Sequence, residues 1–205
     1  MRVIPPREGE VIGDSPDRRV EILSDVDSLH ATWSRFGPRR AGANLHIHDH
    51  HSDLFYVLAG ELTVKLGPDG DETVAPAGTL VRIPPLVVHG FRNGGDAEVR
   101  YLNFHAPGQG FADYMRGLSD FDQDDPPADG GRPVSEVAIV SGDGVLCEAA
   151  EIAVAVLSDD EEHMHAEHVT SLYVLEGEPA GTWLQIPAGE PYRVSGRHLE
   201  VRTPA

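Results

Sequence analysis

The chain has 205 residues, of which 34 are acidic and 16 are basic, for a formal net charge of −18. A charge of this size repels nucleic acid and anionic membranes, so neither is expected as a partner. The single cysteine, Cys147, excludes an internal disulfide framework, and the first residues contain no apolar run typical of a signal peptide, so a cytoplasmic location is expected.

The first predicted region, residues 1–19, is rich in Pro, Arg, Glu and Gly and is expected to be an irregular arm. From Val20 to about Phe104 the chain has short apolar runs separated by turn signals, a spacing typical of β-strands. This part is therefore predicted to be all-β and to close into a barrel or sandwich. Strands are expected at residues 53–58, 62–66, 81–83, 87–89 and 99–104.

The chain then changes character. Residues 110–118 have Phe111, Tyr114, Met115 and Leu118 at helical spacing and predict a short helix. The next segment, 119–132, is rich in Asp, Pro and Gly and is expected to be an acidic linker, with an ordered acidic loop as the alternative. Residues 133–205 return to strand-like runs, such as the one at 152–157.

An internal repeat relates the two strand-rich parts. Seven residues recur at one offset of 117 positions, and two more recur at an offset of 103, so the second copy is shorter by fourteen residues, about one hairpin. We therefore predict a duplicated chain whose second half is truncated. The recurring pairs are His46/His163, His48/His165, His51/His168, Tyr56/Tyr173, Val57/Val174, Leu58/Leu175 and Gly60/Gly177, followed by Gly78/Gly181 and Pro84/Pro187.

Four polar residues of the first copy could hold a metal. Residues two apart in a strand face the same side, so His46 and His48 are expected to project together. Asp53 opens the next predicted strand on its interior face, and His89 follows on a third strand. Imidazoles favour Zn, Cu, Fe and Ni, whereas a carboxylate also accepts Mn, so the set suits one divalent transition metal. It leaves coordination positions open, as in a catalytic site.

The spacing of these residues resembles the two motifs of the cupin superfamily. The first motif is represented by Gly42, His46, His48, Asp53 and Gly60, with Asp in place of the usual Glu and with Gly42 closer to His46 than is usual. The second is represented by Gly78, Pro84, Leu86, His89 and Asn93, with Leu86 in place of the usual Gly.

The resemblance implies a fold and an arrangement of domains. The fold is an all-β, double-stranded β-helix (cupin or jelly-roll) barrel at residues 20–118, followed by a degenerate, truncated cupin-like half at residues 133–205. The whole is similar to two-cupin (bicupin) chains with quercetin 2,3-dioxygenase-like features.

The same resemblance implies that His46, His48, Asp53 and His89 bind Fe, Mn, Ni, Cu or Zn, with Fe or Ni favoured, and that Asp53 is also the catalytic base. Aspartate is one methylene shorter than glutamate, so Asp53 could instead lie outside the coordination shell; His50 and His51 are nearby substitutes. The expected activity is that of a dioxygenase-type oxidoreductase acting on a small aromatic or apolar substrate, with O2 as a candidate co-substrate. The alternatives are a non-oxidative cupin isomerase, cyclase or lyase, and a non-catalytic small-molecule-binding cupin.

In the second copy, Thr170 stands at the carboxylate position and Tyr192 at the position of the last histidine. His163 and His165 remain, so weak metal binding is one alternative. The favoured interpretation is a structural half that covers the first barrel or forms the interface of a homodimer. His105, which follows Phe104, could reach the barrel mouth.

Overall fold

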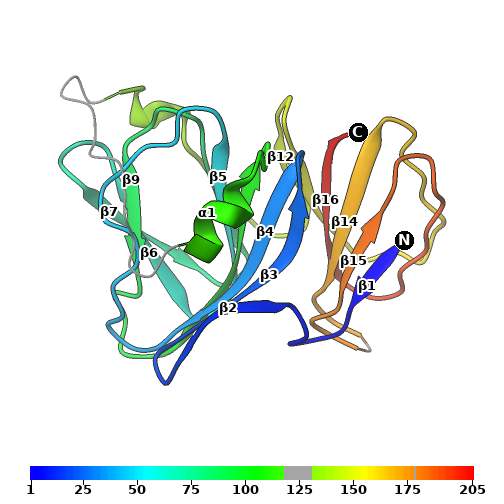
Figure 1. Ribbon diagram of the computed structural model, residues 1–205, viewed down its shortest axis with the longest axis horizontal. Helices are drawn as coiled ribbons and strands as arrows, with labels where there is room; N and C mark the ends of the chain where they lie inside the picture. Colours follow the sequence, from blue (N-terminus) through cyan, green and yellow to red (C-terminus); the bar gives the residue numbers. More distant parts are fainter. Residues whose placement is uncertain (118–130, 178) are drawn as a thin grey trace.

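A computed structural model describes residues 1–117, 131–177 and 179–205 of the chain (Figure 1). In these residues the chain is built almost entirely of strands, with one α-helix, α1 (Phe111–Gly117), and one 3-10 helix, η1 (Val134–Glu136). The strands are β1 (Arg2–Ile4), β2 (Glu10–Ser15), β3 (Arg18–Val26), β4 (Leu29–Phe36), β5 (Ser52–Ala59), β6 (Glu61–Leu66), β7 (Asp71–Pro76), β8 (Thr79–Ile83), β9 (His89–Arg92), β10 (Val99–Ala106), β11 (Ala138–Ser141), β12 (Gly144–Glu148), β13 (Ala153–Leu157), β14 (His168–Val174), β15 (Trp183–Ile186) and β16 (His198–Pro204).

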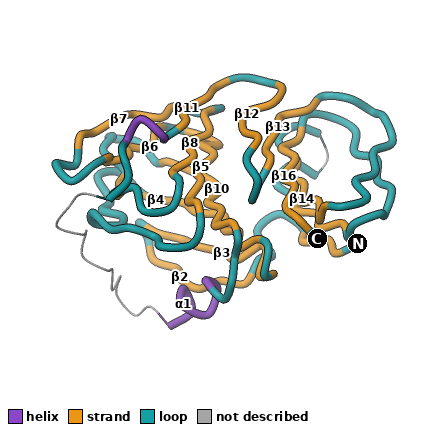
Figure 2. Tube along the Cα trace, turned by 90° about the horizontal axis from the view of Figure 1, so that it is seen from above, coloured by secondary structure: helices purple, strands orange, loops and turns teal. Residues whose placement is uncertain are grey.

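The strands form three antiparallel sheets that lie in layers (Figures 1 and 2). A seven-stranded sheet, in the order β11-β8-β5-β10-β4-β3-β2, occupies the middle. A three-stranded sheet, β7-β6-β9, covers one of its faces and closes the first barrel. A six-stranded sheet, β1-β15-β14-β16-β13-β12, covers the other face. The all-β fold predicted from the sequence is confirmed.

Strand β10 shows why the middle sheet can be covered on both sides. Its side chains alternate between two cores, as the pleat of a strand requires. Val99 and Tyr101 belong to the core inside the first barrel. Leu102 and Phe104 belong to a separate core, shared with Trp183 and other residues of the six-stranded sheet. Because apolar residues occupy both faces, the strand is almost continuously buried.

The N-terminal segment differs from its prediction. Residues 1–19 were expected to be irregular, but they contain two strands: β1 pairs with β15, and β2 pairs with β3. β1 is three residues long and is followed by Pro5-Pro6, so it lacks the length and alternation that identify a strand locally. Its hydrogen-bonding partner lies about 180 residues away, and only the tertiary fold brings the two together.

Strand β1 thus joins the sheet of the second half, and strand β11 joins the sheet of the first half. This strand lies in the segment assigned to the second half, yet it pairs with β8 at the edge of the middle sheet. The predicted boundary at residue 133 is therefore not a boundary between sheets. The acidic linker prediction falls mainly on residues 119–130, which lie outside the described residues. Of its last two residues, Gly131 forms a bridge with Val87, and Arg132 N donates to Leu86 O.

The two larger sheets share one order of strands. The order β11-β8-β5-β10-β4-β3 in the middle sheet corresponds to β1-β15-β14-β16-β13-β12 in the six-stranded sheet. This likeness accords with the sequence repeat, although duplication itself stays a prediction. The predicted helix is present, as α1, within the described residues. In that part of the chain no helix has the length and apolar character needed to cross a membrane.

Candidate metal centre

His46 and His89 face each other across a single antiparallel bridge. His46 N donates to His89 O at 2.8 Å, and His89 N donates to His46 O at 2.9 Å. The prediction that His46 and His48 lie on a strand is wrong, because residues 37–51 form a loop that pairs with β9 only at isolated positions. The two imidazoles nevertheless converge, with their Nε2 atoms 3.3 Å apart.

Two glycines allow this loop to lie so close to β9. A Cβ atom at Gly42 would come within 2.5 Å of the main-chain oxygen of Phe91, and one at Gly90 within 2.8 Å of Asn44 O. Either contact is shorter than side chains tolerate, so each position requires glycine while the loop keeps its path. The loop is thereby held against β9, where the histidines meet.

The four predicted ligands come together inside the first barrel. One ligand atom from each of His46, His48, Asp53 and His89 lies within 4.8 Å of all the others, a spacing that could hold a metal ion. Asp53 Oδ2 is 3.2 Å from His89 Nε2 and 3.9 Å from His48 Nε2, so the shorter aspartate still reaches the set. His46, Asp53 and His89 are buried, and His48 is partly buried.

Backbone carbonyl groups orient two of these imidazoles. His46 Nδ1 donates to Asn44 O at 2.8 Å, and His89 Nδ1 donates to Val87 O at 2.8 Å. Because the proton then lies on Nδ1, the lone pair is on Nε2, the atom that faces the set. Burial, with a contribution from His89, lowers the pKa of His46 to about 4, and burial likewise lowers the pKa of His48. Neutral imidazoles are the form that binds metals, so the residues present fit such an ion.

Asn103 and His105, on β10, complete the surroundings of Asp53. The side-chain amide of Asn103 donates to Asp53 Oδ1, and His105 Nε2 lies 3.6 Å from the same oxygen. Asn103 was not singled out from the sequence, and His105 was placed only near the barrel mouth. Tyr101, Asn103 and His105 are spaced two residues apart, so they lie on one face of the predicted strand, and this spacing could have identified both residues.

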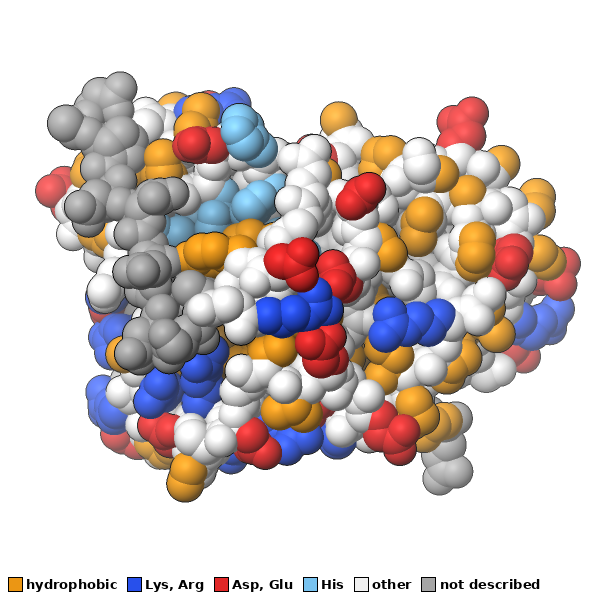
Figure 3. Space-filling model, viewed as in Figure 1, with side chains coloured by type: hydrophobic (Ala, Val, Ile, Leu, Met, Phe, Trp, Pro, Cys, Tyr) orange, Lys and Arg blue, Asp and Glu red, His pale blue; other side chains and the backbone are white. Residues whose placement is uncertain are grey.

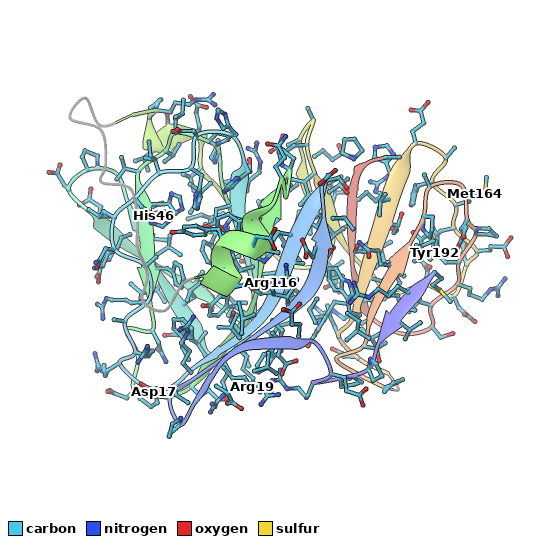
Figure 4. The ribbon with its side chains drawn as sticks, viewed as in Figure 1. Asp17, Arg19, His46, Arg116, Met164 and Tyr192 are labelled. Atoms are coloured by element: carbon cyan, nitrogen blue, oxygen red, sulfur yellow. The ribbon has the colours of Figure 1, made fainter. Side chains whose placement is uncertain are left out.

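A cavity of about 700 Å³ is lined by three of the four predicted ligands, His46, His48 and Asp53. Its wall combines the histidines with apolar side chains, and Figure 3 shows pale-blue histidines beside orange hydrophobic groups on this face. Helix α1 contributes Phe111, Tyr114 and Met115 to the wall, a role that the sequence did not indicate. Arg116 anchors the helix through contacts of 2.8 Å with Glu10 on β2 and Asp25 on β3 (Figure 4).

The polar residues of the second half are arranged differently. His163 Nε2 lies 2.8 Å from Asp159 Oδ1, and His165 Nε2 lies 3.1 Å from the hydroxyl of Tyr192. That hydroxyl donates in turn to Glu200, and burial together with this carboxylate raises the pKa of Tyr192. Figure 4 shows Tyr192 at the opposite end of the molecule from His46. Among the described residues, the groups able to hold a metal all lie in the first half.

Comparisons with known proteins agree with this fold and site. Residues 32–105, which include all four predicted ligands, match the family model described as Cupin domain. A sequence relative is quercetin 2,3-dioxygenase from Bacillus subtilis (strain 168), 29% identical over 92 residues. The match covers 44% of this chain but 27% of that enzyme, so it spans only about a quarter of its length.

Similar solved structures cover the whole chain. Pirin YhhW in complex with nickel(II), from Escherichia coli, has a TM-score of 0.68 at 12% identity over 100% of this chain and 99% of that one. Protein Ylba from E. coli has a TM-score of 0.68 at 15% identity, over 98% of this chain and 89% of that one. Bacillus subtilis oxalate decarboxylase has a TM-score of 0.66 at 11% identity, over 100% of this chain and 77% of that one. At these identities the likeness shows the fold alone. The chain therefore has a cupin fold, and its residues 32–105 match the model of a cupin domain.

Proposed function

We propose that this protein is a metal-dependent cupin enzyme of the dioxygenase type, acting on a small aromatic or apolar organic substrate. The observation that carries the proposal is the convergence of three imidazoles and one carboxylate beside a cavity whose wall also contains apolar and aromatic side chains. Four protein ligands leave positions open on an ion that takes six ligands, as Fe and Ni can, and the adjoining cavity leaves room there for a substrate. The distant relationship to quercetin 2,3-dioxygenase supports the choice of reaction class.

In this proposal His46, His48 and His89 hold a divalent transition metal through Nε2, and Asp53 holds it through Oδ2. Fe and Ni are favoured among Fe, Mn, Ni, Cu and Zn, because imidazoles predominate and one carboxylate is present. When bound, the metal would supply Lewis acidity and a site at which O2 and substrate can meet. The fixed tautomers of His46 and His89 allow the set to form with little rearrangement.

The cavity suits a substrate of moderate size. Ligand pockets are commonly about 300–1,000 Å³ and mainly apolar, with a few polar groups that fix orientation. Phe91, Phe111 and Tyr114 would contact an aromatic ring and exclude water from it. Asp53 is the proposed acceptor of the proton of a substrate hydroxyl group, and the amide of Asn103 holds its carboxylate in place.

The test uses protein purified without chelator and then loaded with each candidate metal. We expect the wild type and the His168→Gln variant, which changes a partly exposed histidine on β14 in the other half of the chain, to retain metal and to consume O2 with a flavonol. The His46→Gln variant should lose both properties. Absence of O2 uptake with every metal would contradict the oxygenase assignment. Turnover of a substrate without O2 would instead favour the isomerase, cyclase or lyase alternative.

A further inference from the structure

A second group of histidines adjoins the four ligands. One ligand atom from each of His48, His51 and His105 lies within 4.8 Å of the other two. His105 is only 3% exposed, and His51 is partly buried. His51 is the last residue of the loop that carries His48, and His105 projects from β10, so different parts of the fold bring them to the cavity wall.

Asp53 lies between this group and the first one. Its Oδ2 is 3.2 Å from His89 Nε2, and its Oδ1 is 3.6 Å from His105 Nε2. Two ligands bonded to one ion at about 2.1 Å, with an angle between 90° and 110°, lie about 3.0–3.4 Å apart. Both spacings are close to this range. The carboxylate thus presents one oxygen to each histidine group, and Oδ1 keeps a lone pair besides the one that accepts from Asn103.

One unpartnered nitrogen atom lies at the same place. His51 Nε2 is buried and has no hydrogen-bond partner among the described residues. Leaving a buried polar atom unpartnered destabilises the fold, and a bound cation would offset this cost. His105 Nδ1 is 3.3 Å from His30 Nδ1. When His105 donates in this contact, its lone pair is on Nε2, the atom that faces Asp53.

Phe111 keeps the imidazoles of this second group in place. Its ring stacks on His105 with centroids 3.7 Å apart at 26°, and its edge meets His51 at 5.0 Å. The packing limits the rotamers of both histidines before any ion arrives, and such preorganisation lowers the cost of binding. His30, which lies at 5.1 Å from the same ring, supports His105 from behind.

We propose that the protein has a second divalent-metal position, bound by His51, His105 and Asp53 Oδ1, with the Asp53 carboxylate bridging the two ions. His48, common to both groups, serves the first position through Nε2, which lies 3.3 Å from His46 Nε2. Paired metal ions in enzymes are about 3.5–4 Å apart and can hold two oxygen atoms of one ligand. The second position goes beyond the proposed function, which needs a single ion.

The test is a titration of metal-free protein with Zn(II), followed by metal analysis after gel filtration. We expect two tightly bound equivalents in the wild type and in the His168→Gln control. His51→Gln should bind one. His105→Phe, which keeps an aromatic ring against Phe111, should also bind one, and His46→Gln should lose the first position but keep the second. Thermal unfolding of each metal-free variant verifies that it is folded.

A single equivalent in the wild type would overturn the second position, as would two equivalents in both His51→Gln and His105→Phe. If that single equivalent disappears in His46→Gln, the first site and the proposed function stand without the second position. If the wild type binds no Zn(II), Ni(II) or Fe(II), both proposals fail.

Discussion

The side-chain amide of Asn103 donates a hydrogen bond to Oδ1 of Asp53, from the strand next to the one that carries the aspartate. A second bond, 3.1 Å long, from the same amide nitrogen to Leu54 O fixes the orientation of the amide. The carboxylate is thereby held with Oδ2 toward His89. Partners of this kind around a metal ligand contribute about 10- to 100-fold to affinity.

Replacing Asn103 with Leu should therefore weaken metal binding by about 10- to 100-fold, because Asp53 loses the group that orients it. A titration with a competing chromophoric chelator would measure the change. Thr32→Val is the matched control. Thr32 is a buried polar residue on β4, directly opposite Asn103 in the strand register, and it is not a proposed ligand. Equal affinity in wild type and Asn103→Leu would show that the amide does not position the carboxylate.

Metal binding should stabilise the fold. A ligand that binds only the folded state at a free concentration 100 times its Kd adds about 2.7 kcal/mol. For a chain of this size we expect Tm to rise by roughly 5–10 °C. Thermal unfolding followed by circular dichroism would measure the shift. His46→Gln should show a much smaller rise and His168→Gln the full one; a full rise in His46→Gln would place the bound metal elsewhere.

Glu151 connects the second half of the chain to the middle sheet. Its Oε1 accepts from Ser52 Oγ at 2.6 Å and from Arg82 Nη2 at 2.6 Å. Burial alone would raise the pKa of Glu151, but these hydrogen bonds outweigh it and lower the pKa below its ordinary value of 4.5. The folded state then holds fewer protons than the unfolded state, so this contribution to stability is present above pH 4.5 and is lost as the pH falls below it.

Glu151→Gln should consequently lower the free energy of unfolding by about 1–3 kcal/mol at pH 7 and by less near pH 3. Urea unfolding at several pH values would measure both effects. Glu148→Gln, at an exposed position on β12, should change little at either pH. If the loss in Glu151→Gln were the same at pH 7 and pH 3, its cause would not be the ionised carboxylate.

Leu86 stands where the second cupin motif usually has Gly, and its φ of 67° is in the left-handed region. A non-glycine residue there costs about 1–2 kcal/mol. Leu86 is 39% exposed, so little packing is lost on its removal. Part of the gain is offset because glycine is more flexible in the unfolded chain.

We expect Leu86→Gly to raise the free energy of unfolding by up to about 1 kcal/mol. Denaturant unfolding would measure this, with Leu86→Ala, which keeps a Cβ at the same φ, as the control. A marked loss of stability in Leu86→Gly alone would mean that the leucine side chain has a packing role.

The sequence was sufficient to select four residues that the structure brings together. His46, His48, Asp53 and His89 could be identified because their spacing between turn signals is distinctive. Their arrangement on a strand was mistaken, since a single bridge to β9 replaces regular pairing and alternation alone does not reveal it.

Contacts set by pairing between distant strands were harder to predict. His105 lies opposite Asp53 only because β10 pairs with β5 in one register, and a single sequence does not specify that register. Helix α1 could be predicted from its periodicity. Its place beside the histidines follows from tertiary packing and from the anchoring of Arg116.

Each half of the chain contributes one strand to the sheet of the other, β1 beside β15 and β11 beside β8, and this affects any attempt to divide the protein. A fragment ending at residue 117 would lack β11, which protects the β8 edge, and would carry β1 with no sheet to join. The complementary C-terminal fragment would expose β15 in the same way. Unprotected edges of this kind recruit other chains, so separate expression of the halves should give aggregates, whereas co-expression should restore a soluble complex.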